Sequence, residues 1–150
     1  MKYLLLLVFV LKFSLLSAQI SFKTGSVQLD ADLNTINRDA RTDINLFMRD
    51  LSLSYNVSEG KLNYMYANLK MIPGDMYLSL EFSREARVSL DRVINVYKTH
   101  KSKGWGFIAK ELGIKPGSPA FHRLKNNASN KKTNSKGQGK KLKKGKNWRA

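Results

Sequence analysis

The chain has 150 residues, a formal net charge of +16 and no cysteine. This length has room for one domain with additional segments. A sequence without cysteine excludes structural disulfides, cysteine-ligated metal sites and lipid attachment to a cysteine.

The N-terminus has the three-part pattern of a secretory signal peptide. The basic start Met1–Lys2 precedes an apolar run to Leu16 that Lys12 interrupts, and Ser17–Ala18 supplies small residues for cleavage. A membrane span needs about 20 apolar residues, so this run is too short to be one. We expect residues 1–18 to be removed as a signal peptide and the mature chain to have no transmembrane segment. Because an exported domain without disulfides suits a bacterial periplasm, we expect a periplasmic or secreted protein.

The following segments read as a lead-in and a helical domain. Residues 19–28 form a short extended lead-in, and residues 29–126 show apolar residues at steps of three and four, which is typical of amphipathic helices. No stretch alternates for long enough to build a sheet. We therefore predict an all-α fold, a small orthogonal bundle of five or six helices. The predicted helices begin near Asp30, Ser58, Pro73, Ser89, Trp105 and Pro119, and they end near Ser54, Lys70, Arg87, Lys103, Leu112 and Lys125.

Four residues mark predicted helix starts. Ser58, Ser89 and Ser118 are predicted N-caps, because a serine hydroxyl accepts a hydrogen bond from an amide of the first turn. Pro73 suits the first helical position, where its missing N–H has no helical partner.

The segment from Gly104 to Lys125, GWGFIAKELGIKPGSPAFHRLK, is the densest run of glycine, proline and aromatic residues. It is similar to a segment of uncharacterised small exported bacterial proteins with the pattern GWG-x-IAK-x-LG-x-KPGS-x-x-FH-x-LK. The stretches YNVSE and MIPGDMYLSLE fit the same pattern, so the resemblance covers most of residues 29–125. It implies export and brings no activity with it. We expect Trp105 to pack in the core rather than to form a ligand platform.

Catalytic and metal chemistry have little support in the sequence. There is no cysteine nucleophile, glycine-flanked serine elbow or paired-histidine motif. The only histidines, His100 and His122, are not spaced as metal ligands. Glu81, Glu85 and Asp91 lie beside arginines in the sequence and are read as members of surface ion pairs. We therefore expect a protein that is not an enzyme, without catalytic, cofactor-binding or metal sites.

The C-terminal segment is the clearest functional lead. Residues 127–150 carry nine Lys or Arg residues, no acid and little apolar content. This composition cannot bury enough surface to offset chain entropy, so we expect a disordered polybasic tail over these residues. Such a tail is suited to polyanions: nucleic acid, anionic lipid head groups or lipopolysaccharide phosphates. The predicted polyanion-binding residues are Lys131, Lys132, Lys136, Lys140, Lys141, Lys143, Lys144, Lys146 and Arg149 in the tail, with Lys110, Lys115, Arg123 and Lys125 near its start.

Three other interpretations are open at this point. The tail can be a solubilising segment without a defined partner. The helical domain can be a periplasmic interaction or sensor module that binds a peptide or protein in a groove, with the tail incidental. Residues Leu78–Tyr97 also read loosely as a DNA-binding helix-turn-helix with its turn at Val88–Ser89. Because Arg87 stands where such turns often have glycine, and export leads away from the chromosome, an ordinary helix pair is favoured over this last interpretation.

Overall fold

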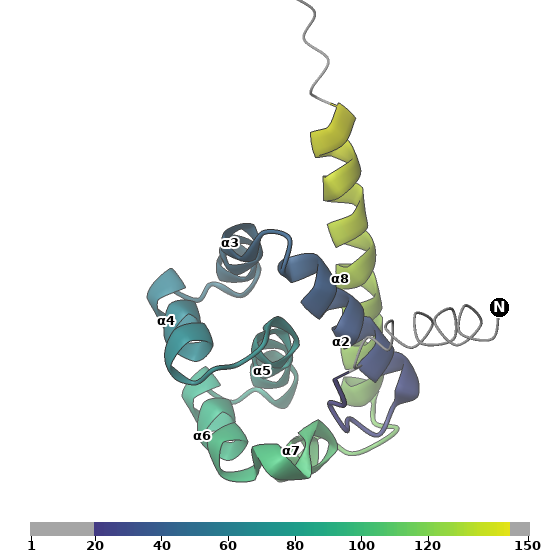
Figure 1. Cartoon of the computed structure of the whole chain (residues 1–150). Helices are drawn as coiled ribbons and strands as arrows, with labels where there is room; N and C mark the ends of the chain where they lie inside the picture. Colours follow the sequence, from purple (N-terminus) through teal and green to yellow (C-terminus); the bar gives the residue numbers. More distant parts are fainter. Residues whose placement is uncertain (1–19, 145–150) are drawn as a thin grey trace, which may run out of the picture.

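A computed structural model describes residues 20–144, with side chains described through residue 132. Every regular element in this range is helical (Figure 1), which confirms the predicted all-α class. The predicted signal peptide at residues 1–18 lies outside the described residues. The elements are α2 (Val27–Ala40), α3 (Ile44–Tyr55), α4 (Glu59–Asn63), the π-helical turn η1 (Tyr64–Asn68), α5 (Pro73–Ala86), α6 (Leu90–His100), the 3-10 turn η2 (Lys101–Lys103), α7 (Trp105–Glu111) and α8 (Pro119–Lys144).

Helix α5 is the centre of the fold. Figure 1 shows α5 encircled by α2, α3, α4, α6 and α7, with α8 running alongside α2. All seven residues from Met76 to Phe82 are buried, so every face of this stretch packs against protein. Tyr77 and Phe82, each 1% exposed, are among its largest core side chains. The rest of the chain is therefore arranged around α5.

The predicted helix starts at the three serines and at Pro73 are confirmed. The hydroxyls of Ser58, Ser89 and Ser118 each accept a hydrogen bond of 3.2 Å from a backbone N–H of the following turn. Pro73 stands at the start of α5. These local signals set the helix boundaries in the middle of the chain as the sequence indicates.

The single helix predicted from Asp30 to Ser54 is wrong, because the chain forms α2 and α3 there. The break falls between Ala40 and Ile44, and the carboxylate of Asp43 caps α3 by accepting a 2.9 Å hydrogen bond from the Leu46 amide. An aspartate N-cap favours starting a new helix over continuing the old one. The apolar spacing runs across the break without interruption and so did not indicate it.

The lead-in is non-helical, as predicted, but it is part of the core. Phe22 is 2% exposed, and the carbonyls of Phe22 and Lys23 accept hydrogen bonds of 2.9 and 2.8 Å from the amides of Trp105 and Gly106. A Cβ on Gly106 would lie 2.9 Å from the Lys23 carbonyl oxygen, so this close approach requires glycine. The GWG motif therefore receives the N-terminal lead-in. The lead-in also ends earlier than predicted, since α2 begins at Val27.

The predicted change to a disordered tail at Asn127 is wrong for the described residues. Helix α8 continues through this point to Lys144. Leu124 and Ala128 are 1% and 0% exposed, so α8 packs against the body on both sides of the predicted boundary. The many lysines and asparagines of this segment indicated disorder. The face of α8 that packs on the body needs only a few small or apolar residues, because polar side chains on the same helix find partners in the body.

Candidate functional site

The first group among the predicted polyanion-binding cations consists of Arg123, Lys131 and Lys132, which are engaged within the protein. Arg123 donates from Nε to Glu85 at 2.7 Å. The ammonium groups of Lys131 and Lys132 form ion pairs with Asp50 and Asp32. These three charges therefore have acidic partners within the protein and attach α8 to α5, α3 and α2.

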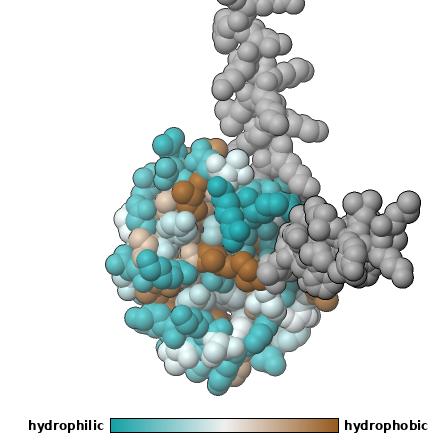
Figure 2. Space-filling view, viewed as in Figure 1, coloured by the Kyte–Doolittle hydropathy of each residue, from teal (hydrophilic) through white to brown (hydrophobic). Residues whose placement is uncertain are grey.

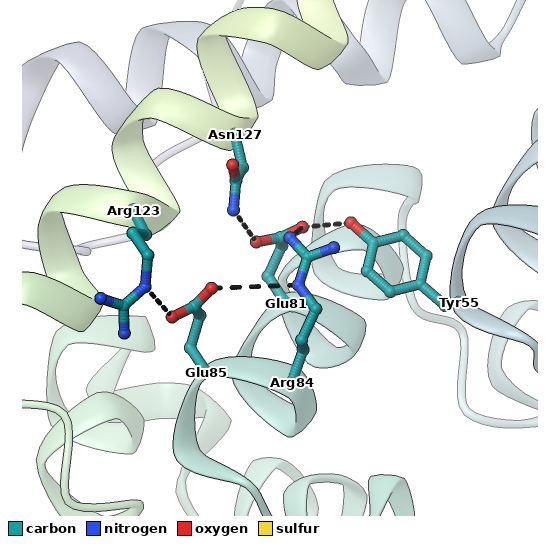
Figure 3. A network of polar contacts seen from close by, with 6 residues as sticks. All are labelled: Tyr55, Glu81, Arg84, Glu85, Arg123 and Asn127. Atoms are coloured by element: carbon teal, nitrogen blue, oxygen red, sulfur yellow. Dashed lines mark hydrogen bonds and ion pairs between the residues drawn. The ribbon is translucent and has the colours of Figure 1, made fainter.

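A polar network around Glu81 holds the first turns of α8 (Figure 3). Glu81 is 0% exposed and accepts hydrogen bonds from the Tyr55 hydroxyl, from Arg84 at 2.6 Å and from Asn127 at 2.9 Å. Burial raises the pKa of Tyr55 far above its usual range, so its hydroxyl stays protonated and can donate. The network joins α3, α5 and α8.

The prediction that Glu81 and Glu85 form ion pairs at the surface is therefore wrong about where these side chains lie. The side chains of Glu81 and Glu85 are only 1% and 8% exposed. Asp91 is the one of the three acids that lies on the surface, where it pairs with Lys61. Because α5 is surrounded by other helices, Glu81 and Glu85 lie between helices. Tyr55, Asn127 and Arg123 of the neighbouring helices supply the donors that offset their burial.

Asp32 anchors the next turn of α8 to α2. It is 1% exposed, pairs with Lys132 and accepts a 3.0 Å hydrogen bond from Gln28 at Oδ1. One residue earlier on α8, Lys131 pairs with Asp50 and lies 5.5 Å from the ring centroid of Phe47. These partners are 100 and 81 residues from their lysines in the sequence. Side-chain spacing along α8 alone could not identify them.

The second group, Lys110, Lys115 and Lys125, lies where α7 turns into α8. Lys110 and Lys115 are exposed and Lys125 is half-buried. Lys110 lines a cavity of about 260 Å³, which we call the α7 hollow. The α7 hollow is lined by Lys23, Thr24, Gly25, Gly106, Phe107, Ala109, Lys110, Ile114, Pro116 and Phe121.

Two lysines at this end of the molecule were not among the predicted site residues. Lys23 also lines the α7 hollow, and the ammonium of Lys103 lies 4.2 Å from the ring centroid of Phe107. Lys23 reaches this place only because the lead-in pairs with the GWG motif some 80 residues later. Lys103 marks the end of a predicted helix, but the sequence does not indicate which surface it belongs to.

The third group comprises the cations that follow residue 132. Lys136, Lys140, Lys141, Lys143 and Lys144 belong to the last part of α8, and Figure 1 shows this part extending beyond the ring of helices. We call residues 133–144 the distal arm. Lys146 and Arg149 lie outside the described residues. The distal arm is therefore a helical continuation of a segment that is anchored to the body by Lys131 and Lys132.

A further carboxylate, Asp75, is half-buried at the N-terminal end of α5. It accepts hydrogen bonds from Trp105 Nε1 at 2.7 Å and from the Tyr97 hydroxyl at 2.9 Å. Trp105 is 3% exposed, which confirms its predicted place in the core. Burial raises the pKa of the Asp75 carboxyl above its usual range, and the bonds from Trp105 and Tyr97 oppose this shift.

This raised pKa makes stability depend on pH in a defined direction. A carboxyl with a higher pKa in the folded chain binds more protons when folded, so its contribution to stability grows as the pH falls from that pKa toward the ordinary value of about 4. Urea unfolding of the wild type and of Asp75→Asn across this range should show the wild type gaining stability relative to the variant as the pH falls. A wild type that gains no stability relative to Asp75→Asn as the pH falls, or that loses stability relative to it, would contradict this description of Asp75.

Other kinds of site find no support in residues 20–144. This part of the chain holds no cluster of three or more His, Asp or Glu residues that could bind a metal ion. None of its helices combines the length and hydrophobicity needed to cross a bilayer. Comparisons with protein-family models, with curated proteins and with solved structures found no match to the chain. Function must therefore be inferred from the chain's own charges and geometry.

Proposed function

We propose that this is an exported protein without enzymatic activity that contacts polyanions through the basic end of α8, and that it belongs with the small exported bacterial proteins that its GWG segment resembles. In this proposal the helical bundle positions the distal arm. The arm and the residues that follow it supply the charge that contacts nucleic acid, anionic lipid or lipopolysaccharide phosphate.

The observation that carries this proposal is the continuation of α8 beyond the body. Its root is attached to the body through Arg123, Asn127, Lys131 and Lys132, and the helical backbone continues from this root through residue 144. Residues 133–150 contain seven Lys or Arg residues and no acid. A fixed basic helix loses less conformational entropy on binding than a disordered tail with the same charge.

A periplasmic peptide-binding or sensor role is the second candidate. A cavity of about 350 Å³ is lined by residues of α3, α5 and the start of α6, among them Tyr55, Leu80 and Leu90. Leu53, which also lines it, is 79% exposed. The face in Figure 2 is largely hydrophilic, with its hydrophobic residues in separate patches. A broad apolar docking surface is therefore not a feature of this face, which favours the polyanion proposal over this candidate.

DNA binding by Leu78–Tyr97 is a weaker alternative. These residues lie in α5, the turn after it and α6, and Arg87 in that turn has a left-handed backbone with φ of 55°. Of the cations in the second helix, Arg92 and Lys98 are exposed. Two cations on one short helix provide much less charge for phosphates than the seven beyond residue 132.

Deleting residues 133–150 tests the proposed function. This variant keeps every described anchor of α8 and removes seven cations, so we expect a folded protein whose affinity for duplex DNA and for phosphatidylglycerol vesicles falls at least about tenfold at low salt. Fluorescence anisotropy and vesicle co-sedimentation measure the two affinities. Affinities equal to those of the full chain would refute the proposal.

The deletion point matters, because the anchors lie just before it. Deleting residues 127–150 instead also removes Asn127, Lys131 and Lys132, and it leaves Glu81, Asp50 and Asp32 without these partners. We expect this longer deletion to lower thermal stability, whereas the shorter deletion leaves it nearly unchanged. The pair of variants separates loss of charge from loss of folding.

A further inference from the structure

The α7 hollow combines an apolar interior with two lysines in its lining. Its walls include Phe107, Ile114, Pro116 and Phe121, and none of its lining residues is acidic. Ile114 is buried, whereas Phe107 and Phe121 are half-buried and reach the surface. The hollow can therefore accept an apolar group from outside without displacing a core side chain.

Lysines from four different segments line the hollow or lie beside its aromatic rings. Lys23 comes from the lead-in and Lys110 from α7, and both line the hollow. Lys103 lies over the ring of Phe107, and the ammonium of Lys125 lies 5.8 Å from the ring centroid of Phe121. Each half-buried aromatic ring thus has a lysine beside it. Lys23, Lys103 and Lys110 are exposed and have no carboxylate partner within ion-pair distance among the described residues.

We propose that the α7 hollow and its lysines bind an anionic phospholipid at a membrane surface, with the lipid phosphate between Lys23 and Lys110 and the upper part of an acyl chain against Phe107 and Phe121. This inference rests on the proposed polyanion-contacting function and names the partner class. The distal arm cannot distinguish lipid from nucleic acid, because it attracts phosphate in either form.

Three physical features favour a lipid over nucleic acid at this surface. Aromatic rings and lysines side by side are suited to the bilayer interface, where the ring enters the acyl boundary and the ammonium meets the head group. Each lysine near an anionic leaflet adds attraction that falls off within a Debye length. A phosphodiester backbone has no apolar group to place in the α7 hollow, whereas burying part of an acyl chain there removes apolar surface from water and favours binding.

The test uses full-length protein and a double variant, Lys23→Asn with Lys110→Gln. Asparagine tolerates the left-handed backbone of residue 23, whose φ is 51°. The matched control is Arg87→Asn with Arg92→Gln, since Arg87 is also exposed and left-handed with φ of 55° and both arginines lie at the other end of α6. The two double variants lose the same charge and replace one left-handed residue each.

The probe is a vesicle of phosphatidylglycerol and phosphatidylcholine, with duplex DNA measured in parallel. We expect the Lys23/Lys110 variant to bind these vesicles at least about tenfold more weakly than the Arg87/Arg92 control does. Phe107→Ser should weaken vesicle binding by about threefold or more while leaving DNA affinity unchanged, because only the lipid offers an apolar chain. Thermal denaturation verifies that all variants are folded.

Two results would overturn this inference. Equal vesicle affinities for the two double variants would assign lipid binding to the distal arm alone, which refutes a lipid site at the α7 hollow and leaves the proposed function standing. If Phe107→Ser binds vesicles as tightly as the wild type does, binding at this surface is purely electrostatic and the proposed acyl-chain contact is refuted. Failure of the proposed function is recognised separately, by unchanged affinities when residues 133–150 are deleted.

Discussion

Replacing Trp105 with alanine is expected to lower the free energy of unfolding by about 3–5 kcal/mol. Trp105 is 3% exposed, and its ring centroid lies 5.2 Å from those of both Phe82 and Tyr97. The substitution leaves a cavity beside the central helix α5 and removes the indole N–H that donates to Asp75. The backbone N–H of residue 105 that donates to the Phe22 carbonyl is kept in this variant, so the lost stability comes from the side chain.

Urea unfolding followed by circular dichroism measures this effect. Trp105→Phe serves as the control, since it keeps an aromatic ring and removes the N–H, and it should cost about 1–3 kcal/mol through the unpaired Asp75 oxygen. A Trp105→Ala protein with wild-type stability but weakened ligand binding would instead identify Trp105 as a ligand platform.

Replacing Glu81 with alanine is expected to destabilise the protein by about 3 kcal/mol, because two donors inside the protein lose their acceptor and each costs about 1–3 kcal/mol. The substitution leaves the Tyr55 hydroxyl and the Asn127 amide without their acceptor inside the protein, and it removes a partner of Arg84. Because Asn127 belongs to α8, the loss should also weaken the attachment of α8 to α5 (Figure 3).

Hydrogen exchange distinguishes a local effect from a global one. We expect amides in residues 119–132 to lose more protection than those of α6 in the Glu81→Ala protein, since the network is a link between α5 and α8. Glu81→Gln is the conservative control, because its amide oxygen can still accept from Tyr55 or Arg84 and its cost should be smaller. Equal stability of Glu81→Ala and wild type would show that the network contributes nothing.

Local signals in the sequence predicted much of the secondary structure. Ser58, Ser89 and Ser118 are N-caps as expected, because a serine before an apolar run acts through its own turn and needs no distant partner. The core position of Trp105 also followed from its sequence context, since large aromatic residues at helical spacing are mostly buried. Both inferences depend on neighbours within a few residues.

The features that the sequence did not reveal include contacts between distant residues. Asp43 divides α2 from α3 although the apolar spacing continues across it. Glu81 reads as an exposed acid beside Arg84, but Tyr55 and Asn127 approach it only in the folded chain. Composition alone cannot predict such contacts, because a charged side chain has the same sequence signature whether it is solvated or paired inside the protein.

The limits of composition are clearest at the start of the predicted tail. Lys131 and Lys132 have the same residue type as the lysines that follow them, yet they pair with Asp50 and Asp32 and lie against the body. The candidate site changes accordingly. Its cations divide into anchors within α8, the distal arm, and the lysines around the α7 hollow, of which Lys23 comes from the opposite end of the domain sequence.

The salt dependence of polyanion affinity tests the central claim most directly. Duplex DNA and phosphatidylglycerol vesicles are titrated from low to physiological salt with the full chain and with a variant whose seven cations beyond residue 132 are replaced by glutamine. We predict a steep fall of affinity with salt for the full chain. For DNA, the slope of the variant should be shallower by several units, about 0.9 for each phosphate that the variant no longer neutralises. Equal slopes for the two proteins, or a full chain whose affinity does not respond to salt, would contradict the claim that the basic end of α8 contacts polyanions.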